Sequence, residues 1–119
     1  MSQKIGFDAE DQARDYLTIQ GLTWISSNYR CRLGEIDLIM RDYDHLVFIE
    51  VRARSTIAFG GAAASVTYSK QQKLIKTASY YLQAFKLQDK QPSRFDVVSL
   101  DGVPPRITWI KNAFESGGR

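Results

Sequence analysis

Residues 34–54, with the sequence GEIDLIMRDYDHLVFIEVRAR, decide the fold of this chain, because two apolar segments flank a short polar turn. The turn at 42–45 separates the expected strands 35–41 and 46–54. With the turn centred between residues 43 and 44, residues whose numbers sum to 87 stand opposite each other. A slip of one residue would scatter the apolar set, so the pattern supports this register. The segment therefore predicts an antiparallel hairpin with one apolar face, formed by Ile36, Leu38, Met40, Val47, Ile49 and Val51.

The other face of the hairpin brings acidic side chains together. In the same register Asp37 stands opposite Glu50, and Glu35 stands opposite Arg52. Opposite Cβ atoms in an antiparallel pair lie about 4.5–5.5 Å apart. Two carboxylates at that distance repel unless a cation, a proton or a basic side chain lies between them. We expect Asp37, Glu50 and Arg52 to converge, and we expect Glu35 to form a cross-strand ion pair rather than to bind metal.

This arrangement suits metal-dependent hydrolysis of phosphodiesters. Carboxylate oxygens hold Mg²⁺ or Mn²⁺, and the metal polarises a phosphate and lowers the pKa of an attacking water. A neighbouring cation such as Arg52 can stabilise the charge of the transition state. The alternative is that Asp37 and Glu50 are solvated acids on a half-exposed strand.

The remaining segments predict a mixed sheet flanked by helices. Helices are expected over 4–20 and 69–86, and further strands over 22–29, 94–100 and 106–110. Gly21 is placed to end the first helix, and Ser69 with Gln72 forms a capping box at the start of the second. Residues 30–34 and 56–64 are read as connections. The order of elements indicates an α/β fold, and we expect residues 1–119 to form one domain.

Composition favours a globular cytoplasmic protein. The chain has 119 residues, of which 44% are hydrophobic and 24% charged. We find no apolar run long enough to cross a membrane and no signal peptide, and we expect no membrane partner. With Cys31 as its single cysteine, the chain has no disulfide framework.

Basic residues gather in the middle of the chain, which has a formal net charge of +3. Arg30 and Arg32 precede the strand of Asp37, and Arg54 follows Glu50. Three lysines step along the second helix at positions 70, 73 and 76. Such a basic rim could bind the phosphates of nucleic acid. A solvated helix face is the alternative for the lysines.

Three other residues invite a functional interpretation that we do not favour. Asp96 lies among apolar neighbours on an expected strand, so a structural role is preferred. His45, in the turn, is not expected to act as a base or a zinc ligand. Glu10, in the first helix, could be a solvated acid or could approach the site.

The motifs Gly34-Glu35-Ile36-Asp37-Leu38-Ile39 and Phe48-Ile49-Glu50-Val51-Arg52 resemble the PD-(D/E)-x-K nuclease signature. More narrowly, the chain resembles the YraN-like family of predicted bacterial endonucleases, which are related in fold to archaeal Holliday-junction resolvases. The resemblance extends to Gly6, Arg54, Gly60 and the segment Phe95-Asp96-Val97-Val98. It implies a restriction-endonuclease-like mixed β-sheet flanked by helices, and it suggests a homodimer.

By this resemblance Asp37 and Glu50 are the metal-binding acids. Glu10 is the acid of the first helix that approaches the same site, and Lys70 is a basic residue at the edge of the second helix. The signature has lysine where this chain has Arg52. Lysine can lose its proton when buried and assist a water nucleophile, whereas arginine stays charged.

Three functions are compatible with these features. The first is an endonuclease, dependent on Mg²⁺ or Mn²⁺, that cleaves DNA, with structured or branched DNA suggested by the resemblance. Its catalytic residues would be Asp37, Glu50, Arg52, Glu10 and Lys70, with Arg30, Arg32, Arg54 and Lys73 binding nucleic acid. The second is a nucleic-acid-binding module whose cleavage is weak or lost. The third is an adaptor for another protein.

Overall fold

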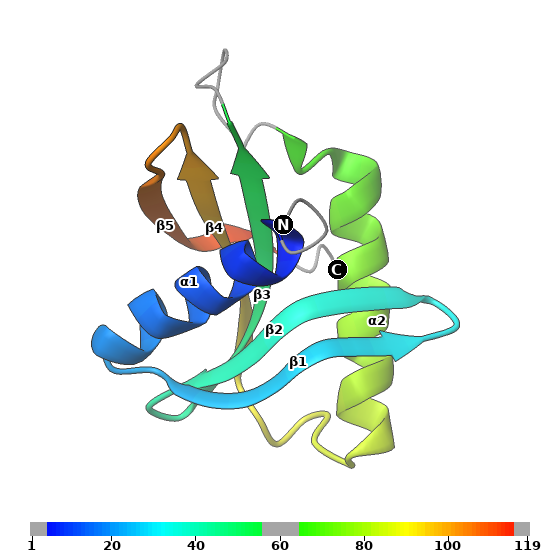
Figure 1. Cartoon of the computed structure of the whole chain (residues 1–119). Coiled ribbons are helices and arrows are strands. Elements are labelled where there is room, and N and C mark those ends of the chain that lie inside the picture. The colour runs from blue at the N-terminus through cyan, green and yellow to red at the C-terminus, as the bar shows by residue number, and fades with distance from the viewer. Residues whose placement is uncertain (1–4, 56–64, 116–119) are drawn as a thin grey trace.

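The computed structural model describes residues 5–55 and 65–115, which form two helices and a sheet of five strands (Figure 1). The helices are α1 (Ile5–Ile19) and α2 (Tyr68–Ala84). The strands are β1 (Thr23–Cys31), β2 (Gly34–Asp42), β3 (His45–Arg54), β4 (Ser93–Asp101) and β5 (Arg106–Phe114). The expected helices and strands are all present, with ends displaced by at most four residues.

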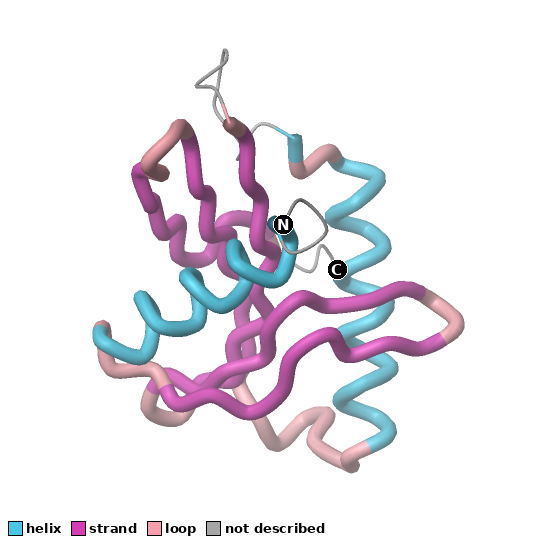
Figure 2. Tube along the Cα trace, viewed as in Figure 1, coloured by secondary structure: helices cyan, strands magenta, loops and turns pink. Residues whose placement is uncertain are grey.

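The sheet is mixed, with the strands in chain order across it. The β1–β2, β2–β3 and β4–β5 pairs are antiparallel, and β3 pairs with β4 in parallel. A parallel pair needs a crossover connection, which α2 provides. Figure 2 shows the two helices packed against the strands. The α/β class is confirmed, and the arrangement is compatible with a restriction-endonuclease-like fold.

The predicted register of the β2–β3 hairpin is confirmed over most of its length. Leu38 pairs with Ile49 and Met40 with Val47, as the sum of 87 requires. Among the described residues, the recorded β2–β3 pairs begin at Leu38, so the ladder stops before Asp37. Beyond this point β2 continues as a partner of β1 alone, because the β1–β2 pairs run on to Gly34.

One predicted member of the apolar face was wrong. Leu38, Met40, Val47, Ile49 and Val51 share the α1 side of the sheet, as expected. Ile36 lies in the other core, which α2 covers. In a regular strand Ile36 and Leu38 would share a face. The chain turns between them, where β2 leaves β3.

Two apolar cores hold the layers together. On the α1 side, Ala9, Ala13 and Leu17 pack against Leu38 and Val98 within a larger cluster. On the α2 side the cluster contains Ile36, Ile39, Leu46, Phe48, Leu74, Ala78, Tyr81 and Phe95. The sheet is therefore buried on both faces where the helices cover it.

The helix ends are set by local chemistry. Gly21 has φ 110°, and the amides of Gly21 and Leu22 bond to the carbonyls of Thr18 and Leu17, which ends α1 as predicted. The predicted cap of α2 was wrong. Thr67, not Ser69, is the N-cap, and its hydroxyl accepts a hydrogen bond from the Lys70 amide. Ser69 lies inside the first turn because the helix begins earlier than expected.

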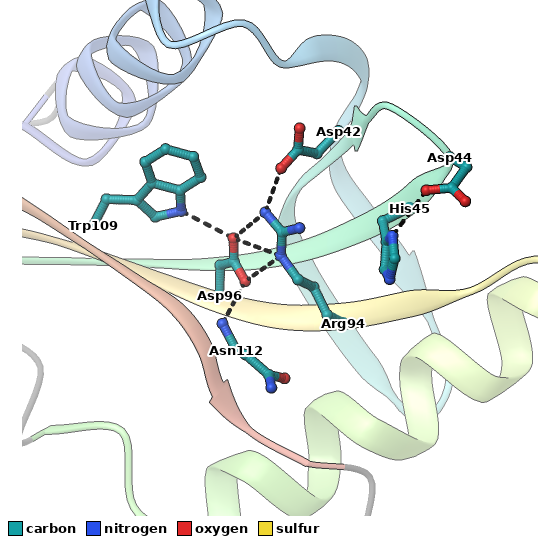
Figure 3. A network of polar contacts seen from close by, with 7 residues as sticks. All are labelled: Asp42, Asp44, His45, Arg94, Asp96, Trp109 and Asn112. Carbon is teal, nitrogen blue, oxygen red and sulfur yellow. Dashed lines mark hydrogen bonds and ion pairs between the residues drawn. The ribbon is translucent and has the colours of Figure 1, made fainter.

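Asp96 is fully buried and anchors a polar network between strands (Figure 3). Its carboxylate accepts hydrogen bonds from the Arg94 guanidinium, the Trp109 indole and the Asn112 backbone amide. Arg94 also pairs with Asp42 at 2.9 Å. The network joins β2, β4 and β5, so the expected structural role of Asp96 is confirmed.

No helix within residues 5–55 and 65–115 is both long and apolar enough to cross a membrane.

Candidate functional site

The candidate site lies where β2 parts from β3. Asp37 is the first β2 residue beyond the β2–β3 ladder, and its Oδ2 accepts a hydrogen bond from the Val51 amide at 2.8 Å. In a continuing ladder, this β3 amide would donate to a backbone carbonyl of β2. Here it donates to the Asp37 side chain instead. Asp37 is held beside Glu50 by this contact.

A cavity of about 500 Å³ opens at this break in the sheet. Its lining comes from α1, β2, β3 and α2, and it includes Glu10, Asp37, Glu50, Arg52, Lys70 and Lys73. All five predicted catalytic residues therefore meet in one cavity, together with one of the predicted nucleic-acid-binding residues. Although α1 and α2 cover opposite faces of the sheet, residues of both helices line this cavity, at the point where β2 parts from β3.

Asp37 and Glu50 are the electrostatic centre of the cavity. Burial raises the pKa of Glu50 to about 7, and the neighbouring Asp37 charge acts in the same direction. Burial also raises the pKa of Asp37, opposed mainly by its hydrogen bond from the Val51 amide. Because each carboxylate disfavours the charge of the other, the pair favours a cation or a proton close by.

Arg52 is fixed beside these acids by two contacts. Its Nη1 lies 3.0 Å from Glu50 Oε2, and its Nε donates to the Ser65 hydroxyl at 2.8 Å. The Arg52 side chain is 20% exposed and that of Glu50 is 12% exposed, so the pair is partly shielded from water. The guanidinium is thus preorganised at the edge of the acid pair.

The expected ion pair between Glu35 and Arg52 is wrong. Glu35 Oε1 lies 2.9 Å from Arg30 Nε, its partner in the β1–β2 register. The prediction extended the β2–β3 ladder past its end at Leu38. Glu35 does line the cavity, at its β2 wall.

Glu10 approaches the acid pair from α1. Burial raises the pKa of Glu10, and the Asp37 charge adds to this rise. The Asn28 side chain lowers the pKa of Glu10, because its amide favours the ionised carboxylate. Glu10 is therefore part of the acid cluster and not a remote surface acid.

The predicted basic rim is only partly assembled. Lys70 and Lys73 line the α2 wall of the cavity, whereas Arg30, Arg32 and Arg54 do not line it. Arg30 is exposed and paired with Glu35, and Arg32 lies in the turn between β1 and β2. Arg54 lines an adjacent cavity of about 310 Å³ that also contacts α1.

The donor set fits a hard divalent cation. Asp37 and Glu50 offer carboxylate oxygens, and Mg²⁺ is commonly held by one or two carboxylates with waters and substrate phosphates completing its shell. In the part of the chain that the structure describes, no group of three or more His, Cys, Asp or Glu side chains is arranged around one metal position. The residues thus fit a cation that shares its coordination with a phosphate better than they fit a closed structural site.

Two contacting residues were missed by sequence reasoning. Ser65 directly follows a segment that offered no pattern, so no signal identified it. Asn28 lies inside a predicted strand, where asparagine is depleted. The presence of asparagine inside a predicted strand was therefore the one sequence feature that could have drawn attention to this residue.

The raised pKa of Glu50 predicts a pH dependence of stability for the metal-free protein. A carboxyl group whose pKa is higher in the folded state favours folding fully below its ordinary value of 4.5. That contribution is lost as the pH rises through about 7. We expect the free energy of unfolding to fall by roughly 2–3 kcal/mol over this window on account of Glu50.

Urea unfolding at several pH values between 5 and about 7.5 measures this fall. Glu50→Gln removes the titrating group and should flatten the curve relative to wild type. Equal slopes for the two proteins would contradict the assignment to Glu50.

Fold and cavity together define a class: a small α/β protein with an acid cluster at a break in a mixed sheet and cations on the adjoining walls. Residues 9–100 match the family described as uncharacterised protein family UPF0102. The chain is 56% identical over 117 residues to a UPF0102 protein of Legionella pneumophila (strain Corby), covering 98% of this chain and 99% of that protein. It is 53% identical over 115 residues to a UPF0102 protein of Coxiella burnetii (strain RSA 331), covering 97% and 95%. The chain belongs to the UPF0102 family, which is the YraN-like family of the sequence resemblance.

Proposed function

We propose that this protein is an endonuclease of the restriction-endonuclease-like superfamily that cleaves DNA with the help of Mg²⁺ or Mn²⁺. The observation that carries the proposal is the convergence of Asp37 and Glu50 in a cavity that Arg52, Lys70 and Lys73 also line. Two buried neighbouring carboxylates cost stability because their charges repel, but they are suited to holding a divalent cation.

Each side chain of the cavity has a role in this mechanism. Asp37 and Glu50 would hold the metal, which when bound polarises the scissile phosphate and lowers the pKa of a water molecule. Arg52, fixed by Glu50 and Ser65, faces the position of the phosphate and stabilises its charge in the transition state. Glu10 lies beside Asp37 and can accept a proton from the attacking water. Lys70 and Lys73 bind the phosphates on either side.

The test is a cleavage screen with Mg²⁺ and Mn²⁺ over duplex, single-stranded, flapped and four-way DNA. The proposal expects metal-dependent nicking or cutting that EDTA abolishes. Preference for the branched substrates would support the relation to Holliday-junction resolvases. The homodimer that this relation suggests stays a prediction. Absence of cleavage on every substrate would contradict the proposal.

One observation favours a second function, a DNA-binding module without cleavage. Arg52 stands where the nuclease signature has lysine, and its guanidinium already neutralises part of the Glu50 charge. Arginine cannot give up a proton at neutral pH. DNA binding without cleavage in the same screen would select this function.

The lysines of the α2 wall predict a salt-dependent affinity for DNA. Lysine contacts release counterions from phosphate, so the affinity should fall as salt is added. Lys70→Ala with Lys73→Ala should weaken binding and reduce the slope of log affinity against log salt by roughly 2. Fluorescence anisotropy with a labelled duplex measures both quantities.

The matched control replaces Lys76 and Lys90, which do not line the cavity, and it alters the net charge equally. If both double variants lose the same affinity, the effect comes from net charge and not from the α2 wall.

A further inference from the structure

The cavity that Arg54 lines adjoins the cavity of Asp37 and Glu50, which is called the acid cavity below. Ala9 of α1 and Ala53 of β3 line both, so the two cavities share a wall of small side chains. The Arg54 cavity has a volume of about 310 Å³. Sites for small ligands usually measure roughly 300–1,000 Å³, so this volume suits a group the size of one nucleotide better than a stacked base pair.

The Arg54 cavity combines apolar walls with one cation. Its apolar lining comes from α1, the end of the sheet and the β4–β5 turn, and consists of Ala9, Ala53, Leu100, Val103 and Pro105. Val103 is 83% exposed, so an apolar side chain is accessible at the edge of the cavity. Gln12 and Ser55 add neutral polar groups, and Arg54 adds the positive charge. A nucleotide matches this lining, because it joins an anionic phosphate to a flat base.

Hydrogen bonds hold the walls of the Arg54 cavity in place. The Gly102 amide donates to the Arg54 carbonyl at 2.9 Å, which fixes the β4–β5 turn beside the end of β3 (Figure 1). The Arg54 Nη1 donates to the Ala53 carbonyl, also at 2.9 Å, so the guanidinium lies close to the residue that both cavities share. The ion pairs of the described residues do not include Arg54. Its other N–H groups can therefore bind a phosphate.

We propose that the Arg54 cavity binds one unpaired nucleotide of the DNA strand that is cut, with its phosphate on Arg54 and its base against Val103 and Pro105. The assignment rests on the proposed function in that a neighbouring phosphate of the same strand is taken to enter the acid cavity. Moving a base from a duplex into a pocket costs free energy, and the cost is least when the base is already unpaired. The substrate class that follows is single-stranded or flapped DNA rather than continuous duplex.

The phosphate contact is tested by fluorescence anisotropy in EDTA with a labelled single strand of thymidines. Arg54→Ala should reduce the slope of log affinity against log salt by about 0.7, the value for one phosphate contact to a single strand. Arg41→Ala is the matched control, because Arg41 is an exposed arginine that pairs with the start of β3 and lines neither cavity. The control should keep the wild-type slope. Equal slopes in the two variants would overturn the assignment.

The base contact is tested with an abasic strand of the same length. Wild type should bind the thymidine strand about fivefold more tightly, the low end for a stacked base, because the described lining of the Arg54 cavity contains no aromatic ring. Val103→Ser should reduce this preference. Ile19→Ser should keep it, because Ile19 is 82% exposed but lines neither cavity. An unchanged preference in Val103→Ser, or an equal loss in Ile19→Ser, would overturn the assignment.

The position of the bound strand separates this inference from the proposed function. In NMR spectra recorded in EDTA, the backbone amide signals of Ser55, Gly102 and Val103 should shift when the thymidine strand is added, and they should shift less in Arg54→Ala. Signals that stay in place, or a wild type that does not bind the strand, would overturn the assignment even if the protein cleaves duplex DNA with Mg²⁺. The expected shifts in a protein that cuts no substrate would contradict the endonuclease and leave the nucleotide site supported.

Discussion

Asp37→Asn is expected to lower metal-dependent DNA cleavage by several orders of magnitude while leaving the fold intact. The substitution removes one of the two charges that would hold the cation, and with it nucleophile activation and charge stabilisation. The asparagine oxygen can still accept the hydrogen bond from the Val51 amide. Relief of the repulsion with Glu50 should hold or raise the melting temperature of the metal-free protein.

The measurements are cleavage rate, DNA affinity without metal, and melting temperature. Asp11→Asn, an exposed acid of α1, is the control for the loss of one negative charge. Arg52→Lys, which restores the residue of the signature, should retain cleavage if Arg52 acts only as a cation. An Asp37→Asn protein that cleaves at the wild-type rate would exclude Asp37 as a metal ligand, and one that unfolds more easily would assign Asp37 a structural role.

Asp96→Ala is expected to destabilise the protein by about 3–5 kcal/mol. The substitution leaves the Arg94 guanidinium, 16% exposed, paired with Asp42, and it removes the acceptor of the Trp109 indole and the Asn112 amide. Breaking a buried charge pair from one side is costly because the remaining charge stays desolvated.

Urea unfolding measures this loss, and Asp44→Ala is the control. Asp44 is an exposed acid of the β2–β3 turn whose side chain contacts the His45 ring at 3.0 Å, so its removal should change stability little. If Asp96→Ala unfolds at the same urea concentration as wild type, the network contributes no net stability.

The hairpin that decides the fold could be predicted because its pattern is periodic. Alternating apolar side chains on both strands allow one register, and the pairs Leu38–Ile49 and Met40–Val47 follow it. Asp37 lies one residue beyond the end of this ladder, and its bond to the Val51 amide keeps it beside Glu50, where the register had placed it. Glu10 and Lys70 could be placed at the cavity only through the resemblance, because contacts between distant elements leave no local pattern.

The errors cluster where the regular pattern ends. Ile36 and the Glu35–Arg52 pair were misplaced because alternation was extended beyond Leu38, where β2 leaves β3. No periodic feature of the sequence marks that point. Its marker is Asn28 on the neighbouring strand, a residue that tolerates a left-handed backbone. The cap of α2 was misplaced for a simpler reason, since Thr67 and Ser69 are both good caps.

The bond between Asp37 and the Val51 amide has a consequence for how this protein could decay during evolution. The Asp37 side chain satisfies the Val51 amide at the edge of β3. A descendant protein without catalytic activity would therefore still be selected to keep a hydrogen-bond acceptor of this size at position 37. Aspartate would persist, or drift to asparagine, long after catalysis had lapsed. An aspartate at this position in a relative therefore indicates an intact sheet edge and is not by itself evidence of catalysis.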